Sequence, residues 1–265
     1  MPSITYLGKT LHYQKTGMGK AVMLLHGFGE DASIFQHQIT ALEDKYTVLV
    51  PHLPGIGLSD FNAAIVSIAD MALAINAILL HENIETCVML GHSMGGYITL
   101  AFADKFPKKI TGFALIHSSA LADNEEKKES RTKAIALMQE HGGAAFLRNT
   151  IPNLFSKESK KDREAAIDNL INTATNFATE TLQHFYKLMI NRPDRQQVLT
   201  NADVPVLFII GEEDAAVLLK DVMPQTKMPK IAYITILENV GHMGMLEATE
   251  KVNDSILHFL ETISD

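Results

Sequence analysis

The sequence predicts an α/β protein, a mostly parallel doubly wound sheet interrupted by a helical insertion. Three observations carry this prediction. Short apolar runs alternate with helix-forming stretches over residues 1–120 and resume over residues 201–265, as in proteins with parallel sheets. Strand signals are missing from residues 121–200. A glycine-rich turn, Gly91–Gly95, joins an apolar run to a helix-forming one.

The first half of the chain predicts a hairpin followed by alternating strands and helices. Ile4–Tyr6 and Leu11–Tyr13 flank Gly8-Lys9, a turn signal. Continuous apolar runs, expected of strands covered on both faces, then alternate with amphipathic stretches. The strands expected are Ala21–His26, Tyr46–Val50, Glu85–Leu90 and Ile110–His117, and the helices are Ala32–Leu42, Ser67–Leu80 and Gly96–Ala103.

The second half predicts a helical insertion and the return of the sheet. Residues 1–120 and 201–265 form the expected core, and residues 121–200 form the insertion. The insertion has a formal net charge of +1, from 12 Lys+Arg against 11 Asp+Glu, in a chain of net charge −8. The helices expected in it are Glu125–Glu140, Lys160–Ile171 and Thr181–Ile190; the strands Val204–Ile210 and Ile231–Leu237 and the helix Thr249–Leu260 follow.

Composition narrows the class of partner. The chain of 265 residues is 46% hydrophobic and 20% charged, which is typical of globular proteins. The net charge of −8 argues against nucleic acid and anionic membranes as partners.

We expect no membrane span, because polar residues break every apolar stretch, and no signal peptide, because the first residues lack a basic start followed by an apolar block. One cysteine, Cys87, suits a reducing compartment, so a cytoplasmic location is expected. The oligomeric state is left open.

Ser93 is the strongest candidate for a catalytic group. Gly91-His92-Ser93-Met94-Gly95 fits Gly-x-Ser-x-Gly, the nucleophile elbow, between a strand and a helix. The sharp turn strains the serine backbone and requires glycine two residues to either side, where a side chain would collide. The serine hydroxyl is then raised clear of the sheet at the positive end of the helix, which favours a developing oxyanion.

A serine needs a base, and that base needs a carboxylate. Of the 11 histidines, His242 stands in a glycine-flanked loop directly after the last expected strand. Asp214 follows the strand Val204–Ile210, so it projects from the carboxyl edge of the sheet, where open α/β sheets place their sites. Glu213 remains a substitute for the acid. The backbone N–H groups of Met94, after the serine, and Phe28, after an earlier strand, are the candidate oxyanion donors.

At this point the chain resembles the α/β-hydrolase-fold serine hydrolases along nearly its whole length. Five motifs occur in order: His26–Gly29, Pro54–Ser59, Gly91–Gly96, Gly211–Asp214 and Gly241-His242. The resemblance implies a Ser-Asp-His triad, no metal and no organic cofactor. It also implies that residues 121–200 are a helical cap that roofs the site. One departure is Pro51-His52, where the family often has an acid.

These features together predict a carboxylic-ester hydrolase that acts on a small apolar ester. Gly27, His117 and Met243 are expected to line the substrate pocket. No paired-histidine metal motif and no Gly-x-Gly-x-x-Gly after a strand is found in the sequence. Two alternatives stay open: hydrolysis of a carbon–carbon bond next to a ketone, which uses the same triad, and a non-catalytic ligand receptor built on this fold.

Overall fold

A computed structural model describes residues 1–263. An eight-stranded sheet runs through this part of the chain, with the order β1-β2-β4-β3-β5-β6-β7-β8. Its strands are β1 (Ser3–Tyr6), β2 (Lys9–Thr16), β3 (Lys20–Leu25), β4 (Tyr46–Pro51), β5 (Cys87–His92), β6 (Ile110–Ile116), β7 (Val206–Gly211) and β8 (Ala232–Leu237). The expected strands and the starting hairpin are therefore confirmed, with ends shifted by at most three residues.

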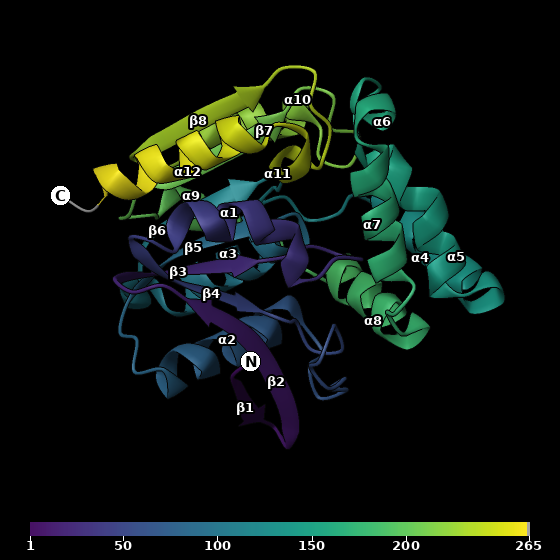
Figure 1. Ribbon diagram of the computed structural model, residues 1–265, viewed down its shortest axis with the longest axis horizontal. Coiled ribbons are helices and arrows are strands. Elements are labelled where there is room, and N and C mark those ends of the chain that lie inside the picture. Colours follow the sequence, from purple (N-terminus) through teal and green to yellow (C-terminus); the bar gives the residue numbers. More distant parts are fainter. Residues whose placement is uncertain (264–265) are drawn as a thin grey trace.

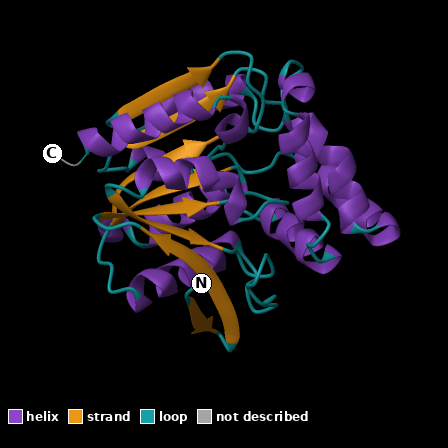
Figure 2. Cartoon of the chain, viewed as in Figure 1, coloured by secondary structure: helices purple, strands orange, loops and turns teal. Residues whose placement is uncertain are grey.

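The sheet is parallel from β4 to β8 in spatial order and antiparallel at β1 and β2. Strands β3, β5, β6 and β7 are buried almost throughout, which is why they appear in the sequence as continuous apolar runs rather than alternating ones. All parallel strands end at one edge, and in Figure 2 their arrowheads point toward a separate group of helices.

Helices cover both faces of the sheet. Helix α1 (Gln36–Leu42), preceded by a 3₁₀ turn at Ala32–Phe35, packs against α12 (Thr249–Thr262), while α2 (Ile68–His81) packs against α3 (Met94–Lys105) (Figure 1). Ser67 accepts a hydrogen bond from Asp70 N at 3.1 Å and so caps α2 at the residue where the sequence placed its start. The sheet is thus doubly wound, as expected.

A second group of helices projects beyond the carboxyl edge of the sheet (Figure 1). It contains α4 (Glu125–His141), α5 (Gly143–Thr150), a 3₁₀ turn (Ile151–Leu154), α6 (Ser159–Asp162), α7 (Glu164–Ala174) and α8 (Thr179–Ile190). Gly142, at φ 86°, ends α4, and α5 begins at the next residue. Helix α9 (Gln196–Thr200) contacts α3 on the core instead. We call α4–α8 the helical group.

Short helices complete the carboxyl-terminal half: α10 (Leu219–Val222), a 3₁₀ turn (Met223–Lys227) and α11 (Gly244–Glu247). A 3₁₀ turn at Pro107–Lys109 precedes β6. Over residues 1–263, no helix has both the length and the apolar character needed to cross a membrane.

Candidate active site

Ser93 stands on a strained turn between β5 and α3. Its backbone has φ 51° and ψ −117°, a conformation that costs energy in a residue other than glycine. A Cβ at Gly91 would lie 2.4 Å from Gly95 O, and one at Gly95 would lie 2.0 Å from Leu25 O. Both glycines are therefore required by close backbone approach. The turn lifts Ser93 to the first turn of α3, where backbone N–H groups lack partners within the helix.

A cavity of about 100 Å³ opens beside Ser93, and residues of both the core and the helical group line it. Ser93 and His242 both line it, and most of the remaining wall is apolar or aromatic. The other lining residues are Phe28, Gly29, Glu30, Tyr97, Arg131, Leu147, Thr150, Ile151, Leu154, Leu170, Tyr186, Met189, Ala216, Val217 and Met243.

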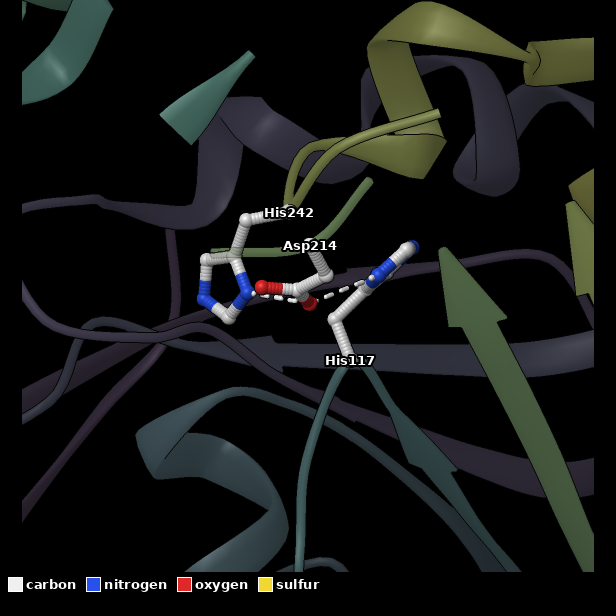
Figure 3. Close-up of side chains that lie close together, drawn as sticks. All are labelled: His117, Asp214 and His242. Atoms are coloured by element: carbon white, nitrogen blue, oxygen red, sulfur yellow. Dashed lines mark hydrogen bonds and ion pairs between the residues drawn. The ribbon is translucent and has the colours of Figure 1, made fainter. Parts of the chain in front are cut away.

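Asp214 lies between two histidines (Figure 3). His242 Nδ1 lies 2.8 Å from Asp214 Oδ2, and His117 Nδ1 lies 3.2 Å from the same oxygen. The other oxygen, Oδ1, accepts hydrogen bonds from the backbone N–H groups of Ala216 (2.9 Å) and Val217 (2.8 Å). All three side chains are buried. The carboxylate is thus held by two ring nitrogens and two backbone donors, which fix its orientation.

The charges of this cluster follow from burial and contact. Burial alone would raise the pKa of the Asp214 carboxyl, but the charge of His242 and the hydrogen bonds from both histidines outweigh it and hold the pKa well below its usual range. Burial alone would lower the pKa of His242, but the Asp214 carboxylate raises it above 6.5. Burial lowers the pKa of His117, so that ring is neutral near pH 7. Since Asp214 is an acceptor, His117 carries its proton on Nδ1.

The two glutamates beside Asp214 face away from His242. Glu213 Oε2 accepts a hydrogen bond from Lys157 N at 3.2 Å, and Glu212 Oε2 lies 3.4 Å from Asn239 N; both side chains are exposed. The acid that contacts the histidine is therefore Asp214, and the substitute, Glu213, contacts the helical group.

The candidate oxyanion donors lie at the ends of two neighbouring strands. Phe28 follows β3, and Met94 is the first residue of α3. The loop before Phe28 is fixed by Gly27 N, which donates to Glu30 Oε2 at 2.8 Å. A Cβ at Gly27 would lie 3.0 Å from both Ser93 Cβ and Glu30 Oε2, so this glycine allows the loop to approach Ser93. The loop Gly27–Glu30, which carries Phe28, and the turn that carries Ser93 are therefore in direct contact.

A buried pair that the sequence did not reveal lies behind the site. Glu30 Oε2 is 2.9 Å from His92 Nδ1, and His92 Nε2 is 3.0 Å from the backbone oxygen of His242. The ring centre of His92 lies 4.9 Å from that of His242. Burial alone would raise the pKa of Glu30, but His92 lowers it below its usual range. This pair connects the loop Gly27–Glu30 to the loop that carries His242.

The His242 loop is also bound to the helical group. His242 N donates to Leu154 O at 2.7 Å. Glu247 accepts hydrogen bonds from the N–H groups of Gly241 (3.1 Å), Met243 (3.0 Å) and Ser156 (2.9 Å). The helical group thus supplies no side chain to the His242–Asp214 pair, but its backbone supports the loop that carries His242.

Two of the three expected pocket residues lie elsewhere. Met243 lines the cavity. Gly27 lies close to Ser93 and His117 contacts Asp214, but neither residue lines the cavity. His117 directly follows β6 and has φ 47°; its ring contacts Asp214 and does not line the cavity. His52 is buried against Gly57 and does not reach the cavity either.

One group of donors has a metal-like arrangement. The candidate ligand atoms of His117, Asp214 and His242 lie within 4.8 Å of one another. Both Nδ1 atoms face a carboxylate oxygen at hydrogen-bond distance, so two N–H donors satisfy the group without an ion. A cation there would have to displace both protons and would occupy His242.

The comparisons with known proteins agree with this architecture. Residues 20–249 match a family model described as the alpha/beta hydrolase fold. A dihydrolipoyllysine-residue acetyltransferase component of an acetoin cleaving system from Pseudomonas putida is 28% identical over 247 residues, which cover 91% of this chain and 64% of that protein. The chain thus spans less than two thirds of the length of that curated relative.

Two further relatives match over most of their length. A 2-hydroxy-6-oxononadienedioate/2-hydroxy-6-oxononatrienedioate hydrolase from Paraburkholderia phymatum is 27% identical over 266 residues, covering 94% of this chain and 90% of the relative. The solved structure of a thermophilic esterase from Thermogutta terrifontis, with malate bound, superposes with a TM-score of 0.92 at 25% identity and covers 98% of this chain and 97% of that one. The sheet order, the elbow and the matched family model together make this chain a member of the α/β-hydrolase family.

Proposed function

We propose that this protein is a serine hydrolase that cleaves carboxylic esters through an acyl-enzyme. The observation that carries the proposal is one cavity lined by both Ser93, on its strained elbow, and His242, whose Nδ1 lies 2.8 Å from a buried carboxylate. Nucleophile, base and orienting acid are the parts that acyl transfer requires. The resemblance to an esterase at a TM-score of 0.92 supports the same class.

In the proposed first half-reaction, Ser93 Oγ attacks the ester carbonyl while His242 Nε2 takes the hydroxyl proton. Asp214 holds the His242 proton on Nδ1 and stabilises the imidazolium that forms. The carbonyl oxygen becomes an oxyanion, and the N–H groups of Phe28 and Met94 are the donors that would stabilise it. His242 then returns the proton to the leaving alcohol as the carbon–oxygen bond breaks.

The second half-reaction mirrors the first. Water gives a proton to His242 as its oxygen attacks the acyl carbon, and collapse of the intermediate returns the proton to Ser93 Oγ and releases the acid. The cavity volume of about 100 Å³ and its mainly apolar wall suit a short acyl chain.

The experiment is a turnover series with p-nitrophenyl esters of increasing acyl length. We expect turnover of the short esters and a steep fall with length, because the cavity is small. A folded protein that hydrolyses none of these esters would contradict the proposal.

A carbon–carbon bond hydrolase is the second candidate. The relative from Paraburkholderia phymatum, which this chain matches over 90% of that protein's length, favours it. Cleavage of a carbon–carbon bond next to a ketone would use the same triad in this chain, so a vinylogous diketone should be offered beside the esters. Faster cleavage of the diketone than of every ester would favour this second function.

A further inference from the structure

The cavity beside Ser93 contains a cation that the proposed ester chemistry does not use. Arg131, on α4, is the only lysine or arginine among the described residues that line this cavity. Its side chain is 20% exposed, so the guanidinium is partly open to a ligand. A guanidinium in a mainly apolar cavity is a strong recognition element for a carboxylate, because its N–H groups form a planar fork.

The positive charge near the cavity is only partly neutralised. Arg131 Nε donates to Asp123 Oδ2 at 2.7 Å, but Arg192 Nη1 also lies 2.9 Å from Asp123 Oδ1. Two guanidinium groups therefore share one buried carboxylate, which leaves one positive charge in excess. Arg192 is committed to the structure: its side chain is 6% exposed and donates to the backbone oxygens of Met189 and Leu121.

The other acid in the cavity wall does not neutralise Arg131. Glu30 accepts hydrogen bonds from Gly27 N at 2.8 Å and from His92 at 2.9 Å. Among the described residues, the ion-pair partner of Glu30 is His92, whereas that of Arg131 is Asp123. The excess charge of Arg131 therefore remains available to a ligand.

Aromatic contacts connect Arg131, through the Tyr186 ring, to Phe28, which carries one of the candidate oxyanion donors. The guanidinium carbon lies 5.2 Å from the centre of the Tyr186 ring, and the Tyr186 ring stacks on Phe28 with centres 4.1 Å apart. Phe28 also supplies one of the N–H groups assigned above to the oxyanion. Arg131, Tyr186 and Phe28 thus form a continuous stretch of the wall of the cavity that also contains Ser93.

From these observations we infer that the substrate is an ester that also carries a carboxylate, which Arg131 binds. The inference rests on the proposed function and narrows its substrate class. The cavity lends itself to a short acid-bearing ester, with Ser93 at the carbonyl and Arg131 at the charged end.

The test compares esters matched in size that differ in charge. With the carboxylate on the acyl side, the pair is p-nitrophenyl hemiglutarate and p-nitrophenyl valerate; on the alcohol side, it is carboxymethyl acetate and propyl acetate. In at least one pair, the wild type should prefer the anionic ester. Arg131→Gln should reduce the anionic-to-neutral ratio of kcat/KM roughly 10- to 100-fold, the usual range for a charge-assisted fork. The ratio is the readout, because Arg131 also pairs with Asp123 in the wall of the cavity and its loss can lower turnover of both esters.

The matched control is Lys133→Gln. Lys133 is on the same helix, is 72% exposed and pairs with Glu129, so its removal should leave both ratios unchanged. Equal loss of anionic and neutral turnover in Arg131→Gln would mean that the arginine is only structural, and an unchanged ratio in both pairs would also overturn the inference.

A measurement on the wild type avoids dependence on how the variant folds. Glutarate should inhibit hydrolysis of a neutral ester competitively, and glutaramide should inhibit it far less. Equal inhibition by the two compounds would overturn the inference. If the folded wild type hydrolyses no ester and Ser93 resists a fluorophosphonate, the proposed function itself has failed, which is a different result from hydrolysis without charge preference.

Discussion

Replacement of His117 by phenylalanine would reveal how the buried acid is tuned. The substitution keeps an aromatic ring between β6 and Asp214 but removes the N–H that faces Asp214 Oδ2 at 3.2 Å. His242 then remains as the side-chain donor to that oxygen, and the two backbone donors to Oδ1 are unaffected. The buried carboxylate becomes less well compensated and attracts the His242 proton more strongly.

The size of the effect follows from that one bond. A hydrogen bond to a charged group contributes about 1.5 to 3 kcal/mol, and 3.2 Å is at the long end of the normal range, so we take about 1.5 kcal/mol. This corresponds to roughly one pKa unit at most. His242 is a base only when neutral, so activity falls as the pH drops through its pKa, which already lies above 6.5. A further rise in that pKa moves the acid limb of kcat/KM to higher pH.

The assay is the pH profile of kcat/KM for p-nitrophenyl acetate between about pH 5 and 9. The matched variant is His117→Asn, because an asparagine N–H takes the place of Nδ1 and asparagine tolerates the φ of 47° at this position. We expect the acid limb to rise by up to about one pH unit in His117→Phe and to stay in place in His117→Asn. Superimposable profiles for the wild type and His117→Phe would refute the reasoning, whatever the two variants do to stability.

Three further predictions follow from the same geometry. Asp214→Asn should lower turnover by roughly 10⁴-fold with unchanged circular dichroism, because an amide favours the wrong tautomer of His242. Glu213→Gln should have much less effect, and the reverse ranking would move the acid role to Glu213. Burial lowers the pKa of His52, so the neutral ring stabilises the fold above about pH 6.5 and this stabilisation is lost as the pH falls. The free energy of unfolding measured in urea should therefore depend less steeply on pH in His52→Asn than in the wild type. Replacing residues 121–200 by a short linker should leave Ser93 reactive with a fluorophosphonate, but more slowly, and should flatten acyl-chain selectivity; a folded core in which Ser93 no longer reacts would show that the replaced segment supplies an essential group.

The sequence predicted the fold well because its strands are continuous apolar runs that are separated by clear helix and turn signals. The apolar runs that became β3, β5 and β7 are buried on both faces, and Gly91 and Gly95 mark the elbow through a steric requirement that the backbone distances confirm. The rule that residues after a parallel strand project at the carboxyl edge placed the acid in the loop after Ile210, but it left Glu213 as a substitute for Asp214. These inferences needed only local pattern and one topological rule.

The supporting contacts could not be predicted, because they join loops far apart in the chain. Glu30 and His92 are 62 residues apart, and His92 and His242 are 150 residues apart. Whether such side chains meet depends on sheet register and on the exact path of each loop. The role of His117 was missed for a related reason: its positive φ turns the ring toward Asp214, and a strand pattern contains no signal for that turn.

The helical group shows the same limit. Its helices were visible in the sequence, yet the contact of His242 N with Leu154 O, at 2.7 Å, was not. A segment expected only to roof the pocket also supports the loop of the proposed base. This is why we expect slower reaction of Ser93 after its removal, and not simply broader selectivity.

The assignment of Ser93 as a nucleophile activated by His242 is the proposal on which the others depend. It is tested most directly by intact-protein mass spectrometry after exposure to a fluorophosphonate, applied to the wild type, Ser93→Ala and His242→Asn. We expect a single adduct on Ser93 of the wild type, no adduct on Ser93→Ala and a greatly slowed reaction of His242→Asn. A folded wild type that forms no adduct, as a non-catalytic receptor would, or an adduct that persists in Ser93→Ala, would contradict it.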